Sequence, residues 1–155
     1  MTVTWSGKQP APHEGTIGNQ LFWPDMDLNQ FSVNYRIPND LDEKTVTEHL
    51  VQAMTDINFR LSDYRTEQLE DGHNTLEEIP AEQVGGESIL LVLYRRAVFC
   101  RGKASVCRDY PAIDRREPAE NQAKSSPDNE ATYLRFADEA VRQFLGLPDI
   151  SVALI

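Results

Sequence analysis

The stretch ESILLVLYRRAVFCRGKASVCRDY, Glu87 to Tyr110, decides the fold class of this 155-residue chain. Its apolar residues recur at steps of three and four, which is the spacing of one face of an α-helix. This face consists of Leu90, Leu93, Ala97, Cys100, Ala104 and Cys107. The first turns are apolar on the other sides as well, so we expect them to be buried all round; the added residues are Ile89, Leu91 and Val92. The stretch therefore predicts a long helix that follows a turn at Gly85 and Gly86 and ends before Pro111.

A second helical pattern lies earlier in the chain, from Asp42 to Asp71. Its apolar stripe also steps by four and three and consists of Val46, Leu50, Met54, Ile57, Leu61 and Tyr64. Asp40 or Asp42 can cap its start, and Asp71-Gly72 is a natural C-terminal stop. We therefore expect one continuous helix here, far longer than the average of ~11–12 residues.

Two further helices are expected outside this pair. A short one is predicted from about Leu28 to Tyr35, with Asp27 as its cap. The last one is predicted from about Asp128 to Leu145, with Ser126 or Asp128 as its cap. Its apolar stripe consists of Tyr133, Ala137, Ala140 and Phe144.

Together these elements predict an all-α fold, a small helical bundle of three main helices plus a short one, with extended N- and C-terminal arms. Residues 1–20 are rich in Gly, Pro and polar residues and are interpreted as the extended N-terminal arm. Residues 21–147 form the predicted helical domain, and residues 148–155 the C-terminal tail. Alternating strand patterns are nearly absent, which favours the all-α interpretation.

The stretch LFWPDMDLNQF, Leu21 to Phe31, begins like a calcium loop. An EF-hand loop that starts at Asp25 needs a glycine at its sixth position and a carboxylate at its twelfth. Those positions hold Gln30 and Arg36, so the calcium interpretation fails. Asp27 is explained more simply as the cap of the short helix.

Two aromatic residues, Phe22 and Trp23, directly precede this cap. An aromatic at such a position can pack back onto the helix within its own chain. It can also anchor in a groove of a neighbouring molecule. Both alternatives stay open for each ring.

The formal net charge is −10, with 25 acidic and 15 basic residues, which works against unaided binding to nucleic acid phosphates or to anionic lipid. The charge is uneven: Leu41 to Pro80 holds ten acidic and three basic residues, and Glu87 to Tyr110 holds two acidic and five basic ones. The two helices can pack against each other, meet between subunits, or present two solvated faces. No apolar run is long enough to cross a bilayer and no signal peptide is evident, so we expect a cytoplasmic protein rather than a membrane protein.

No catalytic constellation is evident. His13, His49 and His73 are scattered, without zinc spacing and without a Cys or Ser placed near a plausible His base. Cys100 and Cys107 are about 10 Å apart along one helix face, too far for a disulfide within the helix. We therefore expect no enzyme, no catalytic residue, no cofactor and no metal.

Five stretches carry a family resemblance when taken in order. They are LFWPDMDLNQF, Tyr64-Arg65, TLEEIPAEQVGGESI (Thr75 to Ile89), LYRRAV (Leu93 to Val98) and the terminal ISVALI. Over roughly residues 20–155 the chain resembles the head completion (head-stabilisation) proteins of temperate contractile-tailed phages, the GpL-type family.

The resemblance implies a virion structural protein that acts after DNA packaging and stabilises the filled head. In helical layout the chain is also similar to the small all-α connector adaptors that form a ring beneath the portal. By that likeness, copies assemble as a ring, twelve-fold like a portal, at the head–tail vertex. The implied partners are the portal protein, the tail-completion proteins and DNA that passes through the channel without sequence-specific contact.

The expected interface residues come from three parts of the chain. They are Phe22, Trp23, Asp25 and Asp27 before the short helix, Arg95 and Arg96 in the long basic helix, and Val152, Leu154 and Ile155 in the tail. The tail can add as a strand to an exposed sheet edge on the portal.

The alternative function is that of a DNA-packaging-associated helical protein similar to a small terminase. Its signature is a basic helix beside a helix-turn-helix. Here the basic stretch Arg95 to Arg108 shares its helix with the most apolar run, and no helix-turn-helix pattern is evident. A salt-sensitive shift of DNA would favour this alternative.

Overall fold

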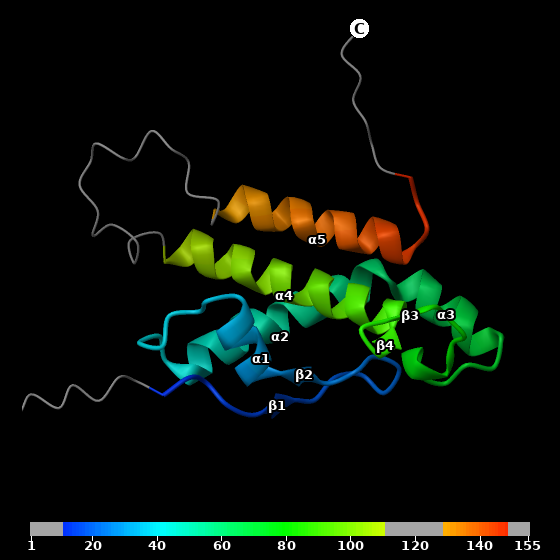
Figure 1. The fold of residues 1–155 in the computed structure, drawn as a ribbon, viewed down its shortest axis with the longest axis horizontal. Coiled ribbons are helices and arrows are strands. Elements are labelled where there is room, and N and C mark those ends of the chain that lie inside the picture. Colours follow the sequence, from blue (N-terminus) through cyan, green and yellow to red (C-terminus); the bar gives the residue numbers. More distant parts are fainter. Residues whose placement is uncertain (1–10, 111–128, 149–155) are drawn as a thin grey trace, which may run out of the picture.

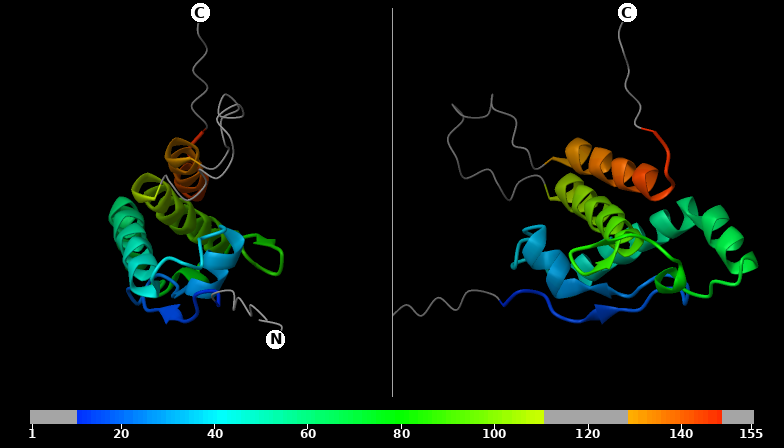
Figure 2. Two further views of the ribbon diagram at one scale, coloured as in Figure 1. Left: turned by 90° about the vertical axis from the view of Figure 1, so that its left-hand side faces the viewer. Right: turned by 45° about the vertical axis from the view of Figure 1, so that its right-hand side comes forward.

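A computed structural model describes residues 11–110 and 129–148 of the protein (Figure 1). The main helices are α1 (Leu28–Asn34), α2 (Glu43–Arg60), α3 (Ser62–Glu70), α4 (Ile89–Asp109) and α5 (Glu130–Phe144). Helix α4 lies between α5 on one side and α2 on the other, and it makes its most extensive contacts with these two (Figures 1 and 2). The predicted helical bundle is therefore confirmed, with α4 at its centre.

Helix α4 buries its middle rather than its first turns. Ser88 caps it, since the side-chain oxygen accepts a hydrogen bond from the Leu90 amide at 3.2 Å. Residues 89–93 are only half-buried, so the expectation of complete burial there is wrong. The buried residues are Tyr94, Ala97, Val98, Phe99, Cys100, Gly102, Lys103, Ala104, Ser105 and Val106. The reason is topological: α1, α2 and α5 surround the middle of α4, and apolar composition alone does not show where these neighbours lie.

The predicted long helix over residues 42–71 is two helices, α2 and α3, joined at Leu61. Leu61 has φ −101° and ψ 13°, outside the α-helical region, while its side chain stays 1% exposed in the core. A straight helix of that length would reach about 45 Å and carry its polar end away from the other elements. The bend instead lets Tyr64 pack edge-on against Phe144 of α5, with ring centres 4.8 Å apart. Periodicity missed the break because the apolar steps continue across it.

The short helix and the last helix begin and end close to the predicted positions. The Asp27 carboxylate accepts a hydrogen bond from the Gln30 amide at 3.0 Å, which confirms the predicted cap of α1. The cap of α5 is Asn129, whose side chain accepts from the Thr132 amide at 2.9 Å. The expected caps Ser126 and Asp128 lie outside the described residues. Helix α5 ends at a turn in which Gly146 adopts φ 67°.

Two small antiparallel sheets make the all-α expectation only partly correct. Strand β1 (Thr16–Ile17) pairs with β2 (Met26–Asp27), and β3 (Gln83–Val84) pairs with β4 (Glu87–Ser88). Gly85 and Gly86 connect the second pair with φ of 63° and 85°, as a two-residue hairpin turn requires. Strands of two residues are too short to produce an alternating pattern, so the sequence did not indicate them. A short 3₁₀ helix, η1 (Leu76–Glu78), follows Thr75.

The described part of the N-terminal arm, residues 11–20, is extended and anchored to the helices. His13 is 4% exposed; its Nε2 lies 2.7 Å from the Leu41 carbonyl oxygen and its Nδ1 3.1 Å from Ser32 Oγ. The Leu28 amide donates to the Gly15 carbonyl at 2.8 Å. This segment therefore belongs to the packed domain.

Candidate assembly surface

Phe22 and Trp23 pack inside the core of their own chain. Each is 3% exposed. The Trp23 ring stacks on Tyr94 of α4, with ring centres 4.8 Å apart and planes 3° apart, and Phe22 meets Trp23 edge-on at 4.7 Å. Of the two alternatives left open, packing within the chain is the one the structure contains. An interface role for these residues stays a prediction, and in the single chain their side chains present almost no surface to a neighbour.

Asp25 organises the loop that carries these rings. Its carboxylate accepts from the Asn19 amide at 2.9 Å, and the Asn19 side chain donates to the Pro24 carbonyl at 2.9 Å. Asp25 and Asp27 are both exposed and hold local turns and caps. Within the described ranges no group of acidic, histidine or cysteine side chains could hold a metal ion.

A buried polar network ties this loop to two helices. The Tyr94 hydroxyl donates to Asn58 Oδ1 of α2 and accepts from Asn19 Nδ2 at 2.8 Å. Asn58 Nδ2 donates to Asn19 Oδ1 at 2.8 Å, which closes a three-membered ring. Burial raises the pKa of Tyr94 far above its usual range, so the hydroxyl stays protonated. Sequence analysis missed this network because its members are far apart in the chain and share no pattern.

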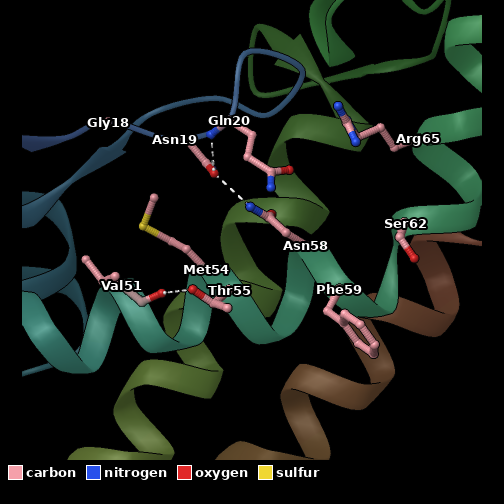
Figure 3. A pocket seen from close by; sticks show the side chains of 10 residues that line it. All are labelled: Gly18, Asn19, Gln20, Val51, Met54, Thr55, Asn58, Phe59, Ser62 and Arg65. Atoms are coloured by element: carbon pink, nitrogen blue, oxygen red, sulfur yellow. Dashed lines mark hydrogen bonds between the residues drawn. The ribbon is translucent and has the colours of Figure 1, made fainter.

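A cleft of about 380 Å³ lies beside this network, where α2 meets α3 (Figure 3). Asn19 and Asn58 line one part of it, and Val51 and Phe59 line its outer edge along α2. Phe59 is 81% exposed. An aromatic ring this exposed on a helix is a candidate contact for another molecule.

Arg95 and Arg96 lie on the far side of the bundle. Arg95 makes two hydrogen bonds of 2.7 Å to the Glu87 carboxylate, which lower the pKa of Glu87. The Arg96 guanidinium lies 5.5 Å from the centre of the Phe136 ring of α5. Both arginines also line a groove of about 240 Å³ between α1 and α4. An interface role for Arg95 and Arg96 stays a prediction, and the groove is the part of the surface to which both contribute.

The acidic and basic helices pack against each other, which was one of the three alternatives. Arg101 of α4 pairs with Asp56 of α2 at 3.1 Å. Arg60 of α2 pairs with Asp138 of α5 at 2.7 Å. Exposed pairs of this kind contribute up to about 1 kcal/mol each. The tail residues Val152, Leu154 and Ile155 lie outside the described ranges.

The comparison with protein families shows to which family the chain belongs. Residues 17–155 match the model of the family described as phage head completion protein (GPL). The chain belongs to this family. The predicted resemblance is confirmed over nearly the whole domain, from β1 to the C-terminus.

Two head completion relatives match along almost their whole length. The head completion/stabilization protein of Escherichia phage P2 is 29% identical over 147 residues, which cover 95% of this chain and 87% of the relative. The probable head completion/stabilization protein of Haemophilus phage HP1 is 25% identical over 151 residues, which cover 97% of this chain and 99% of the relative. No solved structure matches at a significant level.

The fold does place a serine beside a histidine, contrary to the expectation from sequence. His49 Nδ1 of α2 lies 2.9 Å from Ser105 Oγ of α4, and His49 Nε2 lies 3.7 Å from Asp109 Oδ2. The Ser105 hydroxyl donates its single proton to the Gly102 carbonyl at 2.9 Å, so Oγ accepts from His49. The Ser105 proton therefore points away from His49, which is not placed to remove it as a base would. The backbone amides around Ser105 are engaged within α4 and cannot form an oxyanion hole. The contact joins α2 to α4.

Cys100 and Cys107 should differ in reactivity. Burial raises the pKa of the Cys100 thiol, whose Sγ lies 3.8 Å from the Tyr35 hydroxyl oxygen. Because the thiolate is the reactive form, a raised pKa leaves little of it at neutral pH. We expect a thiol reagent to modify the half-buried Cys107 first and Cys100 only at alkaline pH or after unfolding. Peptide mass mapping of partly labelled protein measures this, with Cys107→Ser as control; equal rates at both cysteines would contradict it.

None of the described helices is both long enough and apolar enough to span a membrane.

Proposed function

We propose that this protein completes and stabilises the DNA-filled phage head as a ring of copies between the portal and the tail. The observation that carries the proposal is the match of residues 17–155 to the head completion family. The relative in phage P2 is named for head completion and stabilization. The proposed place of action is the head–tail vertex of the virion, after assembly in the host cytoplasm.

The form of the molecule is compatible with a ring subunit. Its described helices make one packed bundle with exposed features on opposite sides, Phe59 on α2 and the groove beside Arg96 on α4. Rings need two different faces on each subunit, one for each neighbour. A net charge of −10 suits a channel through which DNA passes without adhering. The small-terminase-like alternative gains no support, since both relatives are head completion proteins.

Binding to the portal ring of the same phage tests the proposal directly. The full chain, mixed with purified portal ring and separated on a sizing column with light scattering, is expected to co-elute with it. The mass should rise by about one subunit per portal chain, because rings of matched symmetry contact subunit by subunit. Absence of co-elution would contradict the connector role, and a salt-sensitive shift of DNA by the protein alone would favour the packaging factor.

The C-terminal tail is the proposed contact with the portal. Deleting Ser151 to Ile155 is expected to abolish co-elution and to leave the helical circular dichroism unchanged. A second variant replaces Val152 and Leu154 with alanine, which keeps the chain length, removes the apolar side chains and is expected to weaken co-elution as well. Normal co-elution of the deletion variant would remove the tail from the proposal and leave the connector role standing.

A further inference from the structure

We infer that the cleft where α2 meets α3 binds a carboxylate on an extended segment of another protein of the head–tail vertex, with Arg65 as the cation that receives it. The inference rests on the proposed function for the place of that protein, and it adds a binding site to the tail contact proposed above. Three observations on the same cleft carry it: a guanidinium without a counter-ion, a lining without carboxylates, and an exposed rim along α2.

Arg65 has no counter-ion in the described part of its own chain. Its Nε is buried without a hydrogen-bond partner, and no described carboxylate pairs with its guanidinium. Figure 3 shows the guanidinium turned from α3 towards Gln20 of the N-terminal loop, in the cleft of about 380 Å³. By contrast, Arg60 and Arg101 in the neighbouring cleft along α5 are paired with aspartates. Because a buried donor without an acceptor is costly, an anion beside Arg65 would be stabilised.

The lining of the cleft suits a single carboxylate. Among the described residues that line it, Arg65 is the charged one, and none is an Asp or a Glu. The Gln20 amide and the Ser62 hydroxyl also line it, and neither bonds to another described residue, so both can donate to bound oxygens. A guanidinium holds a planar carboxylate through two parallel hydrogen bonds. A DNA backbone needs several cations instead, and the net charge of −10 opposes it.

Part of the cleft wall is already fixed by the buried network. Asn19 and Asn58 line the cleft, and their side chains are bonded to each other at 2.8 Å and to the Tyr94 hydroxyl. These side chains do not have to be ordered when a ligand binds, which lowers the cost of association.

The rim along α2 fits an extended peptide. Val51, Thr55 and Phe59 line the cleft at steps of four, so they lie on one face of the helix. Val51 is 44% exposed and Phe59 81%. The three residues span about 12 Å of helix, the length of about three to four extended residues. A segment that brings its carboxylate to Arg65 can therefore place an adjacent apolar side chain on Phe59. The partner is thus defined as an extended segment with a carboxylate flanked by apolar side chains.

Two short peptides test the site on the wild-type chain, followed by the NMR shifts of its backbone amides. The probe is acetyl-Leu-Asp-Leu-amide, and the control probe has asparagine in place of aspartate. The aspartate peptide should bind with a Kd of about 1 mM or lower and shift the amide signals of Gln20, Phe59 and Ser62. The asparagine peptide should bind at least about tenfold more weakly, because it lacks the charge. Equal binding of the two peptides, or no saturable shift at these amides, would overturn the inference.

Three variants assign the binding to Arg65. Arg65→Gln removes the charge and should weaken binding of the aspartate peptide at least about tenfold. Arg65→Lys keeps the charge and loses the planar fork, so it should bind between the two. Arg60→Gln is the matched control and should bind like the wild type, since Arg60 is paired with Asp138 and does not line this cleft. Unchanged binding by a folded Arg65→Gln variant would contradict the site.

The same proteins separate the other possible occupants. An oligothymidylate that displaces the aspartate peptide and binds more tightly through Arg65 would assign the cleft to nucleic acid. Self-association of the wild type in sedimentation velocity that Arg65→Gln removes would assign it to a second copy. Either result would overturn the inference. Portal co-elution separates it from the connector role: peptide binding through Arg65 without co-elution contradicts the connector role alone, and co-elution without peptide binding contradicts this site alone.

Discussion

Replacing Trp23 with alanine is expected to lower the free energy of unfolding by about 3–5 kcal/mol. The ring is 3% exposed and stacked on Tyr94, so its removal opens a cavity where the N-terminal loop meets α4. The ring of Phe144 lies 6.2 Å away, so α5 loses contacts as well. Chemical denaturation followed by circular dichroism at 222 nm measures the loss.

Two control variants make this result specific. Trp23→Phe keeps an aromatic ring and removes an indole N–H that has no acceptor among the described residues, so it should lose much less stability than Trp23→Ala. Phe59→Ala removes an exposed ring and should stay within about 0.5 kcal/mol of the wild type. If Trp23→Ala instead kept its stability and lost only assembly, Trp23 would be an anchor between molecules, contrary to its place in the structure.

Replacing Asn58 with alanine is expected to lower the free energy of unfolding by about 1–3 kcal/mol. The change removes the acceptor of the buried Tyr94 hydroxyl and a donor to Asn19. Leaving one polar group buried without its partner destabilises more than removing both. Thermal or urea unfolding of the variant measures the effect.

A double-mutant cycle with Tyr94→Phe tests the network itself. Tyr94→Phe removes the hydroxyl that donates to Asn58 Oδ1. The double variant should therefore lose less unfolding free energy than the sum of the losses in the two single variants. Gln52→Ala, at an exposed position of α2, is the matched control and should change stability by less than about 0.5 kcal/mol. Strict additivity would mean that the two side chains act independently, which the hydrogen bond between them does not allow.

The helices that depend on local signals were predictable. The Asp27 cap lies three residues from the amide that it accepts from, and the Gly85-Gly86 turn needs only its own two residues. The apolar stripe of α5 is also local, and three of its four predicted residues are buried. In such cases the deciding atoms are at most one turn apart, so periodicity and residue type suffice.

The functional surface was less predictable, because it depends on which residues the fold leaves uncovered. Phe22 and Trp23 have the composition of an intermolecular anchor, yet the bundle covers them. Phe59 lies off the apolar stripe of α2, and its side chain is 81% exposed at the rim of the clefts that α2 forms with the N-terminal loop and with α5. Its place off the stripe is a local sign of exposure for Phe59, whereas no local signal shows that the bundle covers Phe22 and Trp23.

By itself, then, the sequence determined the helical class, the caps and turns, and membership of the head completion family, since these rest on residue types and their order along the chain. Only the tertiary structure decided the bend at Leu61, the Asn19–Asn58–Tyr94 network and the burial of Phe22 and Trp23. The physical reason is distance along the chain: Asn19 and Tyr94 are 75 residues apart, and their contact exists only because the packing of α4 against the loop and α2 brings them together.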